Sequence, residues 1–330
     1  MLDRTSLDKV KECLHSGQRF VLTTHVNPDG DGLGSEAALA GYLNAIGKDV
    51  YIYNSNPVPH NYRFLDPQKE MQVYKPETHQ ETLLTADFLL VLDISDWHRL
   101  RRVGEDIKDT RIKKICIDHH PPHERFGDVR LVNVDACSTG EIIYYLIKHC
   151  RGTITKEMAV ALYTSILTDT GSFKFSNTNK SAFSICSELV TCGVVPHKIY
   201  QNIYERQSVS KVKLFGAVLR DLHFEEDGRV VWFKIPQKLM LETGAKPYDT
   251  DGFADYPRVI DGVEISVMFI EIEKDRFKVS FRSKGNYVVN GVAKKFGGGG
   301  HKFAAGLLLE GNLDEYLKKI LHEVSSLFKK

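Results

Sequence analysis

The segment THVNPDGDGLGS, residues 24–35, places one imidazole and two carboxylates within seven residues. His25, Asp29 and Asp31 carry these groups, and the segment holds no lysine or arginine to pair with them. Two ionised carboxylates near one histidine repel each other unless a cation, a donor-rich loop or open solvent relieves the repulsion. Of these three explanations, a bound divalent cation is the one that leads to a function.

Further acidic and histidine side chains follow predicted strands. Three apolar runs of strand length are RFVLTTH, DFLLVLDIS and IKKICIDHH. His25 ends the first run, Asp93 the second, and the third ends in Asp118, His119 and His120. The carboxyl ends of parallel strands share one edge of a sheet, and ligands of such sheets bind beyond that edge. These side chains are therefore expected to lie close together.

Helical patterns alternate with these strands and with a further strand, DVYIYN. One helix is expected to open near Ser35 and to stop at Gly47. Another, over STGEIIYYLIKHC, has Ser138 and Glu141 at the spacing of a capping box. The alternation predicts an α/β domain with a parallel sheet and helices on both faces.

The segment TKEMAVALYTSILTDTGSFKFSN predicts a helix that ends in a buried carboxylate. Leu162 and Ile166 mark its inward face, and Asp169, seven residues after Leu162, falls on the same face. A buried carboxylate is costly unless a positive group meets it. Several carboxylates with one or two imidazoles suit two ions such as Mn²⁺. A metal pair about 3.5–4 Å apart is suited to attack on a phosphoryl centre.

Each of these features also has a simpler explanation. An Asp at a strand end commonly caps the next helix or makes a turn. Adjacent histidines can face opposite sides of a strand, and NPDGDG could be a turn-rich loop, although the EF-hand spacing is absent. The placement of all of them at one predicted sheet edge favours a metal centre.

The sequence changes character after about residue 190. We expect a first domain over residues 1–190, a helical linker over 191–214, and a smaller α+β domain over 215–330. In the last of these, LHFEEDGRVVWFKIP predicts a hairpin and GVEISVMFIEIEKDRFKVSFRSKG predicts two more alternating strands. The amphipathic stripe of the C-terminal helix predicts core packing rather than a partner surface.

The motifs resemble those of a known family. HVNPDGDGLGS, VLDIS, IDHHP and LTDTGSF, in that order, look like the four motifs of the DHH phosphoesterase superfamily. KVSFRSKG and VAKKFGGGGHKFAAG resemble its DHH-associated C-terminal domain. The resemblance covers nearly the whole chain. It is strongest to the nano-RNase/pAp-phosphatase branch, which trims very short oligoribonucleotides and dephosphorylates 3′-phosphoadenosine 5′-phosphate (pAp).

The resemblance implies two Mn²⁺ ions, with Mg²⁺ or Co²⁺ as alternatives, and a bridging hydroxide that attacks phosphorus. The implied ligands of one ion are His25, Asp29 and Asp93. The implied ligands of the other are Asp31, Asp93, His119 and Asp169. The implied catalytic groups are Asp93, His120, which would contact the phosphate, and Asp118, which would orient the histidines.

The second domain would bind the terminal nucleotide of the substrate. In FKVSFRSKG the residues Lys278, Ser280 and Arg282 share a polar face. From this face Arg282 could bind a phosphate through two N–H groups. The glycine run could be a flexible linker, but it is short and lies between packed segments. Lys294 and Lys295 could steer phosphate or merely be solvated. The implied substrate-binding residues are Arg282, Ser283, Gly298, Gly299, Gly300 and His301.

Composition sets limits on the function. The chain has 330 residues, 42% hydrophobic and 26% charged, with a net charge of +1, which disfavours long nucleic acids as ligands. The six cysteines are scattered without a C-x-x-C pair, as in a reduced cytoplasmic protein. The charged, amphipathic start is not expected to be a signal peptide, and no run approaches the roughly 20 apolar residues of a membrane helix. A homodimer is compatible with the sequence.

We therefore expect a phosphohydrolase of short single-stranded RNA or DNA oligonucleotides and of pAp, acting as an exonuclease in RNA degradation. A phosphodiesterase for cyclic or linear dinucleotides would carry the same motifs and stays an alternative. A RecJ-like exonuclease would carry further domains, and a manganese pyrophosphatase would lack the GGGGH segment. A non-catalytic nucleotide-binding regulator would have lost a metal ligand, and every implied ligand is present.

Overall fold

The computed structural model describes residues 3–94, 96–108, 110–121 and 127–329. The chain forms two compact units, residues 1–206 and 207–330, and each is described by itself. The division falls inside the segment predicted as a helical linker. No helix of the described residues is long and apolar enough to cross a membrane. All six cysteines are free thiols.

The first unit is built on a parallel six-stranded sheet in the order β3-β2-β1-β4-β5-β6. Phe20 and Leu22 of β1 point into one apolar core, and Val21 between them points into another, so both faces are buried. The predicted fold class is confirmed. The strands are β1 (Arg19–Thr23), β2 (Asp49–Asn54), β3 (Met71–Val73), β4 (Phe88–Leu92), β5 (Lys113–Asp118) and β6 (Val129–Val132).

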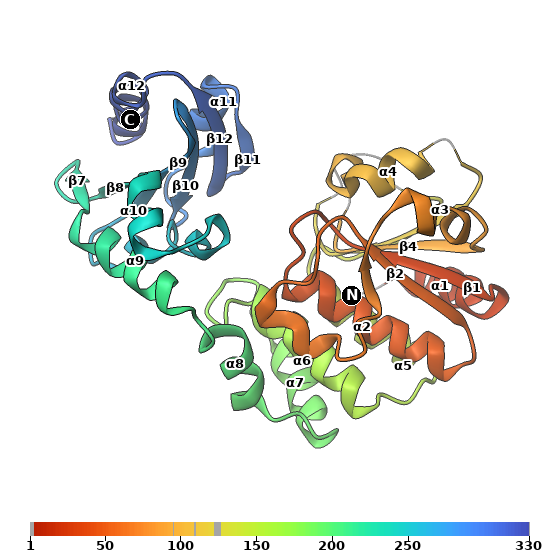
Figure 1. Ribbon diagram of the computed structural model, residues 1–330. Coiled ribbons are helices and arrows are strands. Elements are labelled where there is room, and N and C mark those ends of the chain that lie inside the picture. The colour runs from red at the N-terminus through yellow and green to blue at the C-terminus, as the bar shows by residue number, and fades with distance from the viewer. Residues whose placement is uncertain (1–2, 95, 109, 122–126, 330) are drawn as a thin grey trace. The chain divides into compact units, whose positions relative to one another are not determined.

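Helices cover both faces of this sheet, with α3 and α4 on one side and α2, α5 and α6 on the other (Figure 1). The helices are α1 (Arg4–Ser16), α2 (Gly30–Ala45), α3 (Pro76–Leu84), α4 (Arg101–Ile107), α5 (Thr139–His149), α6 (Lys156–Asp169), α7 (Lys180–Thr191) and α8 (Pro196–Tyr204). Two 3₁₀ turns are η1 (His60–Leu65) and η2 (Trp97–Leu100).

Helix α2 begins five residues earlier than the sequence predicts, at Gly30 instead of Ser35. The side chain of Asp29 caps it by accepting hydrogen bonds from the backbone N–H groups of Asp31 and Gly32. Glycine is unfavourable in a helix by itself, but these glycines pack against neighbours. A Cβ atom on Gly34 would lie 2.4 Å from the carbonyl oxygen of Ala161 in α6. Close packing of α2 on α6 therefore overrides the low helix propensity of the segment.

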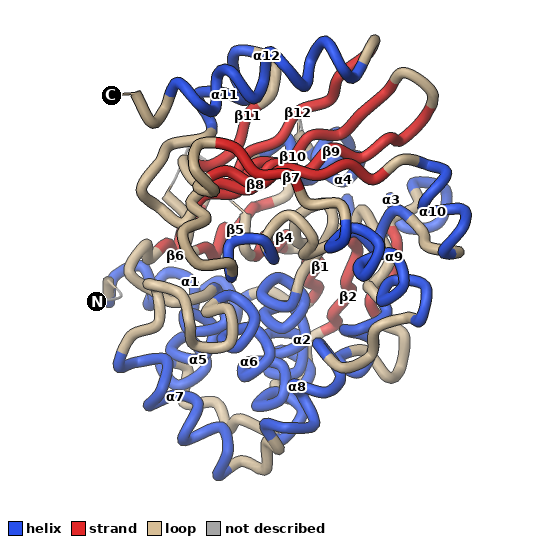
Figure 2. The backbone as a smooth tube through the Cα atoms, turned by 90° about the vertical axis from the view of Figure 1, so that its left-hand side faces the viewer, coloured by secondary structure: helices blue, strands red, loops and turns tan. Residues whose placement is uncertain are grey.

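The second unit is a mixed six-stranded sheet in the order β11-β12-β10-β9-β8-β7. Helices α11 and α12 lie on one face of it (Figure 2), and apolar residues of α9 and α10 pack on the other. The strands are β7 (His223–Glu225), β8 (Val230–Ile235), β9 (Ile265–Glu273), β10 (Arg276–Ser283), β11 (Gly299–His301) and β12 (Ala304–Glu310). The helical elements are α9 (Val209–Arg220), α10 (Gln237–Thr243), η3 (Pro247–Thr250), η4 (Tyr256–Val259), α11 (Asn290–Lys295) and α12 (Leu313–Ser326).

Several predictions for this unit are confirmed. The hairpin β7–β8 and the pair β9–β10 form as predicted, and Ile320 and Val324 of α12 are buried in the core. The glycine run is not a flexible linker, because Gly299–His301 pairs as β11 with β12. Strands β3, β6 and β12 are not anticipated by the sequence patterns.

We predict opposite effects on stability for two glycine-to-alanine substitutions. Gly34→Ala should lower the free energy of unfolding by about 1–3 kcal/mol, because the methyl group would overlap a backbone oxygen. Gly216→Ala, in α9 with open space around it, should raise that free energy by about 0.5–1 kcal/mol. Calorimetry of both variants measures the two changes in the free energy of unfolding. Equal shifts of the same sign would contradict the close packing of α2 on α6.

Candidate metal and phosphoester site

The predicted site lies where the strand order reverses. From β1 the chain continues to β2 and β3 on one side, and from β4 it continues to β5 and β6 on the other. Ligands of open α/β sheets bind at such a point, beyond the carboxyl ends of the strands. His25 comes two residues after β1, Asp93 follows β4 directly, and Asp118 is the last residue of β5.

One set of possible ligands surrounds His25. Its Nε2 atom lies 3.6 Å from Asp29 Oδ2 and 3.4 Å from Asp93 Oδ2. The three residues form a group that could hold a metal ion. His25 and Asp93 are buried, whereas the Asp29 side chain is 55% exposed.

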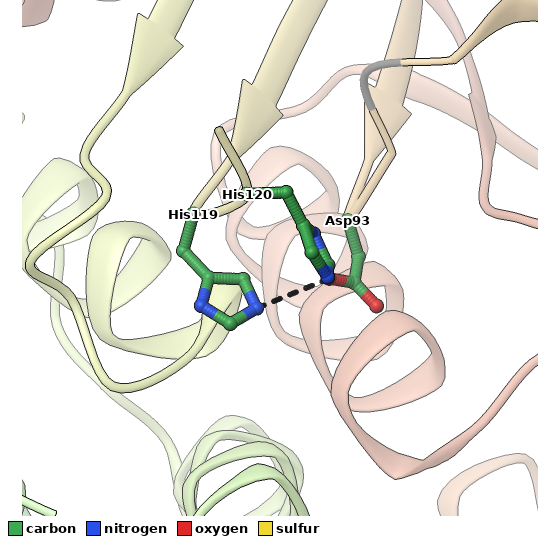
Figure 3. Close-up of side chains that lie close together, drawn as sticks. All are labelled: Asp93, His119 and His120. Carbon is green, nitrogen blue, oxygen red and sulfur yellow. Dashed lines mark ion pairs between the residues drawn. The ribbon is translucent and has the colours of Figure 1, made fainter. Parts of the chain in front are cut away.

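A second set surrounds His119, whose Nε2 atom faces three carboxylates. It lies 3.5 Å from Asp31 Oδ2, 3.6 Å from Asp169 Oδ2 and 3.6 Å from Asp93 Oδ1, the last marked in Figure 3. Asp93 thus turns Oδ2 toward the first set and Oδ1 toward the second. One carboxylate could therefore contribute to both sets.

The ring nitrogens of His25 and His119 are oriented so that Nε2 of each could bind a cation. His25 Nδ1 lies 2.9 Å from Val26 O, and His119 Nδ1 lies 3.4 Å from Ala136 O. A carbonyl oxygen can only accept, so Nδ1 carries the proton and, in the neutral ring, Nε2 offers its lone pair. His119 Nε2 is buried and forms no hydrogen bond with any described residue. Its distances to the carboxylates resemble the roughly 3.0–3.5 Å between two ligands of one cation.

Asp31 is fixed by the start of α5 and by α6. Its carboxylate accepts hydrogen bonds from the N–H groups of Thr139 at 2.9 Å and Gly140 at 3.2 Å, and from the Ser165 hydroxyl. A helix N-terminus favours negative charge. Sequence reasoning missed these partners, although the Ser138 cap that marks the start of α5 was visible.

Asp93 occupies a backbone conformation that few residues adopt. Its φ angle is +61°, in the left-handed region that Asp and Asn tolerate better than most side chains. Its Oδ1 atom also accepts a hydrogen bond from the Thr139 hydroxyl at 3.2 Å. Such strain is commonly retained at functional sites.

His120 is held by Asp118. The Nδ1 atom of His120 donates to Asp118 Oδ1 at 2.7 Å, and the His120 backbone N–H donates to the same oxygen at 3.1 Å. Burial disfavours the charged ring, but this hydrogen bond and the nearby Asp93 carboxylate raise the pKa of His120 to about 9. The His119 ring bonds to Ala136 instead, so these bonds orient only one of the two histidines that Asp118 was expected to orient.

Burial and the close spacing of the carboxylates raise the pKa values of two acids in the cluster. Burial, with Asp31 and Asp93 nearby, raises the pKa of Asp169 to about 9. Burial and Asp31 also raise the pKa of Asp93 well above its usual value. Burial disfavours charge on His25, but its contacts with Asp29 and Asp93 raise its pKa to about 10. Without a cation, the cluster therefore retains protons at neutral pH.

Hydrogen bonds next to the candidate ligands, which the sequence did not indicate, connect the ends of the strands. Asn54, the last residue of β2, accepts a hydrogen bond from Thr24 N and donates to the buried Glu36 carboxylate at 2.8 Å. The Thr24 hydroxyl donates to the carbonyl oxygen of Leu92. These bonds tie the ends of β1, β2 and β4 together, directly before His25 and Asp93.

The predicted substrate-binding residues lie together in the second unit. In the strand pairing His301 faces Ala304, and Ala304 faces Arg282. Ser283 ends β10, and its backbone N–H donates to Phe303 O. Gly298 directly precedes β11, which contains Gly299, Gly300 and His301.

The sheet topology and the cluster of side chains define an α/β protein with a carboxylate–histidine centre that could hold divalent cations. Residues 19–166 match the family model of the DHH family, N-terminal domain, and residues 229–330 match the DHHA1 domain. The chain belongs to the DHH family, as the resemblance of its motifs predicted.

Similar proteins cover nearly the whole chain. It is 34% identical over 304 residues to a Thermus thermophilus protein named bifunctional oligoribonuclease and PAP phosphatase NrnA, covering 92% of this chain and 88% of that protein. A Bacillus subtilis protein with the same name is 28% identical over 290 residues, 87% of this chain and 88% of the relative. The structure of an exopolyphosphatase-related protein from Bacteroides fragilis has a TM-score of 0.94 at 28% identity, over 100% of this chain and 99% of that one.

We predict that cation binding displaces protons from this cluster. The pKa values of Asp169 and His25 lie above 7, so both are protonated at neutral pH and must lose protons to become ligands. The apparent affinity for Mn²⁺ should therefore rise between pH 6 and 8.5, by about tenfold per pH unit for each proton displaced. Calorimetric titrations in buffers of different ionisation enthalpy count these protons.

When Mn²⁺ binds, the Asp169→Asn variant should release fewer protons than the unchanged protein. Asp49→Asn, which removes an exposed carboxylate at the start of β2, serves as the matched control and should behave like the unchanged protein. A pH-independent affinity would contradict the assignment of these residues as ligands.

Proposed function

We propose that this chain is a metal-dependent hydrolase of phosphoester bonds that degrades short single-stranded oligoribonucleotides and dephosphorylates pAp. The observation that carries the proposal is Asp93, whose two oxygens face separate histidine–carboxylate sets in a member of the DHH family. The substrates are those named for the relatives from Thermus thermophilus and Bacillus subtilis. The net charge of +1 fits short substrates better than long ones.

Two divalent cations, Mn²⁺ in the first place and Mg²⁺ or Co²⁺ as alternatives, suit the oxygen and imidazole donors of the two sets. When bound, they would act as Lewis acids on the phosphoryl oxygens and make water a better nucleophile. The proposed ligands are His25, Asp29, Asp31, Asp93, His119 and Asp169.

His120 is the proposed group that contacts the scissile phosphate. Its side chain is 31% exposed, so part of the ring is accessible while Nδ1 is held by Asp118. A ring fixed in this way can donate a hydrogen bond to a phosphoryl oxygen without first being ordered. Asp118 is completely buried and acts by orienting that ring.

The glycine run is the proposed site of backbone contact with the terminal nucleotide. Gly298 has a packing reason to be glycine, because its Cβ atom would lie 2.4 Å from Gly306 O. Gly300 has a φ of +132° and would contact Ala304 O. Gly299 has neither reason, since nothing described lies within 4 Å of its Cβ position. The absence of a side chain at Gly299 fits close approach of a ligand to the backbone.

Asp93→Asn should remove the activity. Asn tolerates the left-handed backbone at this position but lacks the charge that two cations would share, so turnover should fall by more than about 100-fold. Product formation is followed from 5′-labelled RNAs of two to ten nucleotides, from pAp and from a linear diadenylate, each with Mn²⁺ and with chelator.

Metal-dependent cleavage that is fastest on the shortest RNAs, together with turnover of pAp, is the expected result. Asp49→Asn controls for loss of a carboxylate and should retain full activity. If the diadenylate alone is turned over, the proposal is wrong and the chain is a dinucleotide phosphodiesterase. Nucleotide binding without any turnover would indicate a non-catalytic regulator.

Gly299→Ala should impair substrate binding without disturbing the fold. The methyl group meets no atom of the described chain, so it should raise KM by about tenfold only if substrate approaches this backbone. Gly291→Ala, in α11 and equally unobstructed, is the matched control and should leave KM unchanged. Steady-state kinetics on a trinucleotide compare the two; equal KM values would remove Gly299 from the binding site.

A further inference from the structure

Asp255 and Arg258 join the segment around η4 to the end of β10. Arg258 Nη2 lies 2.5 Å from Asp255 Oδ1, and Arg258 Nη1 donates to the carbonyl oxygen of Ser283 at 3.1 Å. The backbone N–H of Arg258 also donates to Asp255 O. One guanidinium therefore fixes the position of Ser283 relative to the carboxylate of Asp255.

The same carboxylate holds Arg282. Arg282 Nε lies 3.2 Å from each oxygen of Asp255, and its Nη1 donates to Phe281 O at 3.0 Å. These bonds set the plane of the guanidinium. Nη2 has no partner within the described part of the chain, and 30% of the side chain is exposed. The Nη2 group of Arg282 is thus available to bind an anion.

The charges of this group favour a phosphate. Two guanidinium ions share one carboxylate, which leaves a net charge of +1 across Asp255, Arg258 and Arg282. A flexible arginine loses much side-chain entropy when it is ordered by a ligand. Because Asp255 already orders Arg282, less of that entropy remains to be lost when phosphate binds.

We propose that Asp255 and Arg258 are positioning residues, which orient Arg282 and Ser283 for the phosphate of the terminal nucleotide. This inference rests on the proposed function, in which Arg282 and Ser283 bind substrate. Neither Asp255 nor Arg258 is itself assigned a contact with the reacting atoms.

The test compares Asp255→Ala and Arg258→Lys with the control Asp261→Ala. Among the described residues, the Asp261 side chain bonds only to the neighbouring Gly262 N–H. Steady-state kinetics on a trinucleotide give KM and kcat, and equilibrium binding of pAp in chelator gives an affinity without turnover. Both test variants should raise KM and weaken pAp binding by about tenfold, with kcat changed less than twofold, because each loses a charge-assisted hydrogen bond.

A double-variant cycle shows whether Asp255 acts through Arg282. Asp255→Ala added to Arg282→Ala should change KM less than twofold further. Arg258→Lys keeps the charge and carries the test if Asp255→Ala does not fold, as judged by thermal melting.

Other outcomes would overturn the inference. Tighter pAp binding by Asp255→Ala would mean that Asp255 only lowers the local positive charge, and additive effects would mean that it acts independently of Arg282. If the unchanged enzyme cleaves RNA while both test variants match the control, this inference fails and the proposed function stands. If the unchanged protein neither cleaves RNA nor binds pAp, both fail.

Discussion

Repulsion among buried carboxylates is the constraint on which the first unit depends. Asp31 and Asp93 are buried, and Asp169 and Asp29 lie beside them at the same edge of the sheet. Burial makes the charges of Asp31 and Asp93 costly, and proximity makes all four charges costly together. The protein offsets part of this cost with the N-terminus of α5 and the hydroxyl groups of Thr139 and Ser165. The raised pKa values of Asp93 and Asp169 show that the offset is incomplete.

Helix packing positions these charges. The N-terminus of α5 reaches Asp31 because Gly140 allows close contact, since a Cβ atom there would lie 2.0 Å from Ser165 Oγ. Gly34 allows α2 to approach α6 in the same way. Gly30 and Gly34 of the first motif are therefore explained by close contact with α6, and Gly32 by close contact with the Thr24 side chain after β1, while the carboxylates of the motif are explained by chemistry.

The sequence predicts the candidate site well because the site follows regular elements. Strands end where apolar runs end, and the carboxyl ends of parallel strands share one edge, so the sequence alone places Asp93 and His119 near each other. The start of α2 could not be predicted, because tertiary packing outweighs the poor helix propensity of Gly30 and Gly32. The partners of Asp31 could not be predicted either, since Thr139 is 108 residues away in sequence. Asp255 lies beside a short 3₁₀ turn that has no periodic pattern to mark it.

The order of the ligand cluster along the chain has a consequence for biosynthesis. Its residues run from His25, after β1, to Asp169, at the end of α6, and β1 pairs with β4 only after β2 and β3 have been made. A nascent chain therefore cannot assemble the cluster until α6 has left the ribosome. Until then Asp169, which faces His119 in the second set of ligands, is missing from the cluster. Assembly of the charged centre is thus a late event in translation, and a chain truncated before α6 would lack both Asp169 and the helix on which α2 packs.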